Sequence, residues 1–108
     1  VVLGTSPLLV PYVDPGLRLA QEVRRLLHER DSGVPRVIYL QNHGMFALGT
    51  SEADVLQITQ MAVKVARVLL GASSVGHPAF MDSTEVDRID TRPDELLRRA
   101  TLAQSSDP

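Results

Sequence analysis

The chain has 108 residues, of which 44% are hydrophobic, and this is enough for one domain with its own core. A net charge of −2 and only 4% aromatic residues argue against nucleic-acid binding, and the absence of cysteine excludes a disulfide framework and a thiol nucleophile. Charges interrupt the apolar stretches before about 18 residues, and no signal-peptide pattern opens the chain. We therefore expect a cytoplasmic protein without a membrane partner.

The amino-terminal residues have the composition of short extended segments. We expect such segments at residues 1–3 and 8–13. Pro7 and Pro11 exclude a helix there and disfavour a central strand, because proline fixes φ and cannot donate a backbone hydrogen bond. An edge strand or an irregular crossover is the better prediction.

A helix is predicted over residues 15–30. Asp14 can cap its first turn, and Pro15 suits the first helical position with its fixed φ and missing donor. Apolar residues recur at i, i+4, i+7 and i+8 and charged residues take the opposite side, so one face is expected in the core. The apolar face consists of Leu19, Val23, Leu26 and Leu27. His28 complements the dipole at the end of this helix, which accounts for it without a functional role.

Two apolar runs of strand length and composition, residues 37–41 and 45–48, lie close together in the chain. Only Asn42, His43 and Gly44 separate them. Asn and Gly both tolerate the positive φ that a tight reversal needs, so the spacing predicts a hairpin or a sharp kink between adjacent strands. His43 would lie at its tip.

A second helix is predicted from Ser51 to Leu70. Ser51 and Asp54 have the spacing of a capping box, and Gly71 is a plausible stop. The polar stripe of this helix is narrow, so its wide apolar surface needs more than one covering partner. It is expected either to be buried centrally or to supply a subunit contact.

The remainder of the chain predicts a loop, two short helices and a tail. The loop contains His77, for which the sequence offers no chemical role. Asp82 is positioned to cap a helical turn over residues 83–89, and a final helix is expected over residues 94–102, with acidic residues first and basic residues late. Residues 104–108 are expected to fray.

His43 has two interpretations on residue pattern alone. It is either an ordinary turn residue next to Asn and Gly, or a metal ligand or general base held rigidly by two strands. A zinc site needs about three protein ligands, and the sequence contains no HxH, HExxH or cysteine pair. The motif evidence does not complete a metal site.

The order of motifs resembles the class II aldolase/adducin family. PYVDPG at residues 11–16 precedes a helix, and LQNHGMFALG at residues 40–49 precedes a long helix with an acidic cap. The resemblance covers residues 10–70, and DTRPDE at residues 90–95 is also similar to the tail of some members. It implies an α/β fold of three αβα layers, with a mainly antiparallel sheet covered by helices, of which residues 1–103 form the carboxyl-terminal part.

What the resemblance implies for His43 is a metal site. The family holds a divalent metal, usually zinc, by three histidines, two from an HxH pair and the third from the NHG tip, which His43 matches. The metal binds the carbonyl and hydroxyl of a sugar phosphate and stabilises the enediolate formed when a carbon-carbon bond is cleaved or made. The HxH pair, the acidic proton acceptor and the phosphate-binding loops have no counterpart in this chain. It therefore lacks most of the active site, and no catalytic residue is assigned.

These features favour a zinc-dependent aldolase, a lyase of carbohydrate metabolism, with homotetramers as in many family members. A sugar-phosphate 4-epimerase of the same family and a non-catalytic adducin-like assembly module without metal remain alternatives. Val1 and Val2 lie directly in apolar sequence, so we expect the chain to be part of a longer one. A free-standing protein that has lost the site is the remaining possibility.

Overall fold

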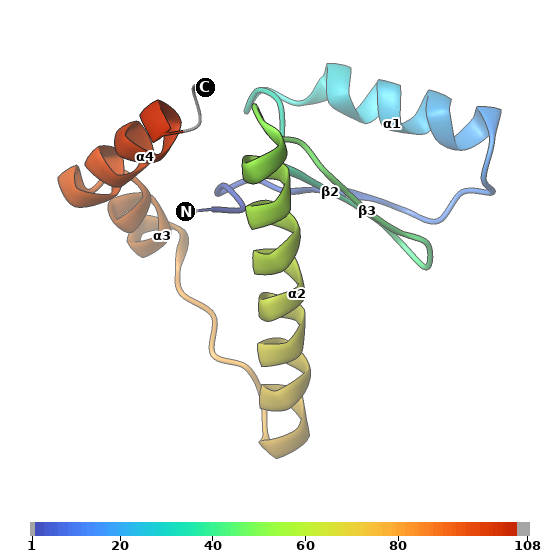
Figure 1. The fold of residues 1–108 in the computed structure, drawn as a ribbon. Coiled ribbons are helices and arrows are strands. Elements are labelled where there is room, and N and C mark those ends of the chain that lie inside the picture. The colour runs from blue at the N-terminus through green and yellow to red at the C-terminus, as the bar shows by residue number, and fades with distance from the viewer. Residues whose placement is uncertain (1, 106–108) are drawn as a thin grey trace.

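The computed structural model describes residues 2–105 (Figure 1). They form a mixed α/β structure with one small, open three-stranded sheet and four helices, which confirms the predicted α/β class. The elements in chain order are β1 (Leu8–Val10), α1 (Leu17–Glu29), β2 (Val37–Leu40), β3 (Gly44–Ala47), α2 (Glu52–Val75), α3 (Ser83–Asp90) and α4 (Pro93–Ser105).

The sheet has the order β1-β2-β3. β1 pairs in parallel with β2, so that Leu9 lies opposite Tyr39, and β2 pairs antiparallel with β3, so that Tyr39 also lies opposite Met45. β1 is an edge strand, as its flanking prolines predicted. The described sheet is therefore mixed, with one parallel and one antiparallel pair, because α1 carries the chain from β1 back to the start of β2 and makes that pair parallel.

One face of the sheet packs against α1. Val10, Ile38 and Leu40 are buried there, since alternate residues of a strand point to the same face. The apolar stripe predicted for this helix covers them, and its contacting residues are Leu19, Val23, Leu26 and Leu27. The amphipathic pattern therefore identified the correct face of α1.

The start of α1 differs from the prediction. Gly16 is the N-cap residue, with φ at 115°, and no side chain caps the helix. The carboxylate of Asp14 instead accepts a hydrogen bond from the hydroxyl of Tyr12 at 3.3 Å. Upstream of β1, Val2 and Leu3 lie in a turn and not in the expected extended segment, while Val1 lies outside the described residues.

α2 begins as predicted and ends later. The Ser51 hydroxyl accepts a hydrogen bond from the Asp54 backbone N–H at 3.2 Å, which confirms the cap. The helix continues through Gly71 to Val75, because a glycine inside a helix costs only about 1 kcal/mol and does not by itself end it. Along this length α2 buries only Ile58 and Ala62.

An ion pair fixes α2 to the sheet. The Arg36 guanidinium, next to β2, pairs with the half-buried Asp54 carboxylate, which also accepts the Thr50 N–H at 3.0 Å. Gly49 lies so close to this junction that a Cβ at its position would be 2.9 Å from Asp54 Oδ2 and 3.0 Å from the Val55 backbone nitrogen. A side chain there would disturb both the ion pair and the first turn of α2.

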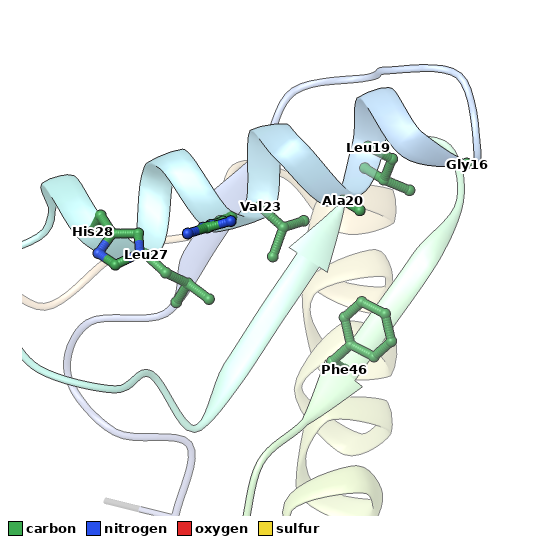
Figure 2. A pocket seen from close by; sticks show the side chains of 8 residues that line it. Gly16, Leu19, Ala20, Val23, Leu27, His28 and Phe46 are labelled. Carbon is green, nitrogen blue, oxygen red and sulfur yellow. The ribbon is translucent and has the colours of Figure 1, made fainter.

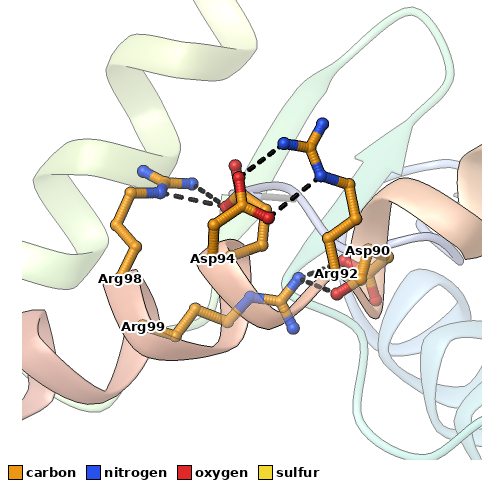
Figure 3. A network of polar contacts seen from close by, with 6 residues as sticks. Asp90, Arg92, Asp94, Arg98 and Arg99 are labelled. Carbon is orange, nitrogen blue, oxygen red and sulfur yellow. Dashed lines mark hydrogen bonds and ion pairs between the residues drawn. The ribbon is translucent and has the colours of Figure 1, made fainter.

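α3 and α4 make their main contacts with each other. Asp82 caps α3 as predicted, since its carboxylate accepts the Glu85 N–H at 2.9 Å. Arg99 of α4 reaches back to the carbonyl oxygen of Asp90 at 3.1 Å and to its carboxylate, within the polar network of Figure 3. α4 includes residues 104 and 105, which were expected to fray, while residues 106–108 lie outside the described residues.

Candidate functional site

His43 lies in the three-residue turn between β2 and β3, as the sequence predicted. Its backbone N–H donates a hydrogen bond to the Leu40 carbonyl oxygen at 3.1 Å, which closes the turn. Asn42 has φ at 55°, the left-handed conformation that Asn tolerates. Gly44 is already part of β3 and has no positive φ, so Asn42 is the residue that permits the reversal.

The turn is also attached to the segment that follows β1. The Gln41 N–H donates to the Val10 carbonyl oxygen at 3.0 Å, and the Gln41 side-chain oxygen accepts the Tyr12 N–H at 3.1 Å. Two strands and this crossing segment thus hold the backbone on which His43 is mounted. Sequence reasoning missed the role of Gln41, because its partners are about 30 positions away and no local pattern indicates them.

The side chain of His43 is exposed to solvent. Among residues 2–105 no group of three or more His, Cys, Asp or Glu side chains is placed to hold a metal ion. His28 belongs to α1, and His77 belongs to the segment between α2 and α3. The described residues therefore offer one suitable zinc ligand, the accessible imidazole of His43 on its fixed backbone. The further ligands would have to come from outside these residues.

Among residues 2–105, three carboxyl groups have lowered pKa values, each with a local cause. The Arg25 guanidinium hydrogen-bonds to Glu22 and lowers the pKa of that carboxyl, and Arg92 lowers the pKa of Asp94 in the same way. The Asp82 carboxyl has a lowered pKa because the Thr84 hydroxyl and the Glu85 N–H donate to it. These carboxyl groups belong to surface ion pairs on α1 and α4 and to the cap of α3.

A groove of about 530 Å³ runs between α1 and β3 (Figure 2). Phe46 lies on the same face of the sheet as Ile38, its register partner, but α1 does not cover it and it is 51% exposed. Val23 and Leu27 point from α1 towards the strands on the other side of the groove. His28 lines this groove and His43 does not, so the structure does not bring these two histidines into one site.

Comparison with known proteins identifies no related protein. The chain has no match among protein-family models, among curated proteins or among solved structures.

Proposed function

We propose that the chain is the carboxyl-terminal portion of a metal-dependent aldolase that cleaves a sugar phosphate reversibly at a carbon-carbon bond. In this proposal the fold belongs to a three-layer class II aldolase-like domain, and His43 is one ligand of a zinc ion or another divalent metal. The order of the PYVDPG and NHG motifs and their following helices supports the proposal.

The geometry of His43 is the observation that carries the proposal. Its imidazole is exposed, while hydrogen bonds from His43 and Gln41 and the left-handed Asn42 fix the backbone beneath it. A metal ligand benefits from such fixation, because less side-chain freedom is lost when the metal binds. An imidazole buried among aliphatic side chains would not have been available to other ligands.

In this proposal the metal, the residues of this chain and the rest of the protein have separate roles. When bound, the metal would supply Lewis-acid stabilisation of the negative charge that develops on the substrate. His43 would donate a ring nitrogen, and Asn42 would keep the turn in the conformation that presents it. The remaining ligands, the proton acceptor and the phosphate-binding groups are expected from a part of the protein outside this chain.

The test is the metal content of the product of the whole coding sequence. We expect stoichiometric zinc in the unmodified protein, with loss of most of it in His43→Ala and retention in the matched controls His28→Ala and His77→Ala. Equal zinc in all four proteins would contradict the proposal. An HxH pair encoded upstream of Val1 would identify the expected additional ligands.

The same preparation separates the alternatives. Formation of a ketose phosphate from an aldehyde and a three-carbon phosphate supports the aldolase, whereas interconversion of two epimeric sugar phosphates without release of fragments supports the epimerase. A protein that contains no metal and has neither activity would favour the adducin-like assembly module.

A further inference from the structure

The turn that carries His43 receives little support from packing. Its three residues, Gln41, Asn42 and His43, are all exposed, whereas Leu40 directly before them is buried. An exposed turn has few apolar contacts that could hold it in one place. The position of this turn relative to the sheet therefore depends mainly on its hydrogen bonds.

Within residues 2–105, the turn makes three hydrogen bonds. Two join backbone groups, since the His43 N–H donates to the Leu40 carbonyl oxygen at 3.1 Å and the Gln41 N–H donates to the Val10 carbonyl oxygen at 3.0 Å. The third uses a side chain, because Gln41 Oε1 accepts the Tyr12 N–H at 3.1 Å. Ordinary substitutions leave the two backbone bonds in place, so the third is the bond that depends on which residue occupies position 41.

Gln41 makes this contact where the ladder between β1 and β2 ends. The last register partners of the two strands are Val10 and Leu40, and the chain then reverses at Asn42, which has φ at 55°. The Gln41 side chain provides the acceptor for the next N–H of the segment that follows β1, and it joins residues 29 positions apart. The connection between the two segments thereby continues to the base of the turn.

We propose that Gln41 is a positioning residue for His43 in metal binding, an inference that rests on the proposed function. Its side chain ties the turn to residue 12 and so limits how far the backbone of His43 moves relative to the sheet. A ligand that is already held in place loses less freedom when the metal binds. Gln41 acts in this way through the backbone of the turn and is not itself a ligand.

The test compares the product of the whole coding sequence with four variants of it. Gln41→Leu removes the acceptor and has a similar volume, whereas Gln41→Glu keeps an acceptor oxygen at the same reach. Gln57 is exposed on α2 and makes no side-chain hydrogen bond within residues 2–105, so Gln57→Leu is the matched control. His43→Ala tests the ligand itself.

Hydrogen exchange of the His43 amide, measured with a chelator present, tests the positioning without any metal. Loss of one hydrogen bond should make this amide exchange about two- to tenfold faster in Gln41→Leu. Exchange should be unchanged in Gln57→Leu and no faster in Gln41→Glu. The proposal is overturned if the amide exchanges equally fast in Gln41→Leu and in the unmodified protein.

Zinc affinity, measured by competition with a chelator, tests the consequence for the metal. We expect Gln41→Leu to bind zinc about two- to tenfold more weakly, with no loss in Gln41→Glu or Gln57→Leu. Urea unfolding of the metal-free proteins should give similar midpoints for the two leucine variants. A weaker affinity that only accompanies a lower unfolding midpoint would overturn the positioning role, because general loss of stability would then explain it.

The variants also separate this inference from the proposed function. Loss of zinc in His43→Ala together with normal affinity in Gln41→Leu would overturn the positioning role alone. Retention of zinc in His43→Ala would contradict the proposed function, and the positioning role would fall with it.

Discussion

The sheet with α1 and the pair α3–α4 are held together by different interactions. In the first region, Val10, Ile38 and Leu40 are buried beneath the apolar face of α1. In the second, the ordered contacts are a helix cap, ion pairs and the reach of Arg99 to Asp90, and no residue of α3 is buried. Apolar burial supplies most of the free energy of folding, whereas exposed ion pairs contribute about 0–1 kcal/mol each.

The contrast shows how unevenly stability is distributed along the chain. A local hydrogen bond specifies where α3 begins, but such exposed contacts give α3 and α4 little resistance to opening. The site residue His43 belongs to the more stable region, because its turn is hydrogen-bonded to both β1 and β2. The following predictions test this contrast.

The largest effect is expected in the core beneath α1. Ile38 is 3% exposed, so Ile38→Ala should lower the free energy of unfolding by about 2–5 kcal/mol through lost burial and a cavity. Leu97→Ala removes a similar side chain that is 69% exposed on α4, and it should change stability by less than about 0.5 kcal/mol. Urea unfolding followed by circular dichroism measures both. Similar losses for the two variants would remove the distinction between the regions.

An intermediate effect is expected where α2 joins the sheet. Gly49→Ala would bring a methyl group against Asp54 and the Val55 backbone, and we expect a loss of about 1–3 kcal/mol from this overpacking. Gly71→Ala is the matched control, since a Cβ at that position meets nothing within 4 Å and should be neutral or slightly stabilising. Thermal unfolding of the two variants is sufficient to compare them. A Gly49→Ala protein as stable as the control would show that the junction is loosely packed.

The smallest effect is expected at the cap of α3. The lowered pKa of Asp82 means that its stabilising contribution is complete above the ordinary carboxyl pKa of about 3.9 and is lost as pH falls through the lowered value in the folded protein. The Glu85 amide resonance should therefore shift between neutral and strongly acidic pH. Asp82→Asn keeps an acceptor without ionisation and should lose most of this shift, while Asp82→Ala should reduce α3 helicity at all pH values. A shift that persists unchanged in Asp82→Asn would assign it to another group.

Short-range residue patterns were sufficient to predict much of the fold. The caps of α2 and α3 depend on residues three positions apart, and the apolar face of α1 follows from its periodicity. The hairpin around His43 followed from Asn42 between two apolar runs. These features need no information from distant parts of the chain.

The errors arose where distant contacts decide the structure. The parallel pairing of β1 with β2 depends on the path of α1. Asp14 binds the Tyr12 hydroxyl instead of capping α1, and the backbone N–H of Tyr12 is in turn bound by the distant Gln41. The groove beside Phe46 lies between α1 and β3, and no spacing in the sequence indicates it. For the candidate site, the sequence predicted the place of His43 but not its anchoring by Gln41. The metal itself stays a prediction, since one ligand does not define a coordination sphere.

Within the part of the chain that the structure describes, the sheet has an unpaired strand edge on both sides. β1 and β3 are its outer strands, and within residues 2–105 each uses only one of its two edges. Exposed edges of this kind can recruit strands from other molecules, so concentrated solutions of the isolated chain should tend towards intermolecular sheet growth. For crystallisation or spectroscopy, charged substitutions at outward-facing positions of these strands are the natural means of keeping the protein dispersed.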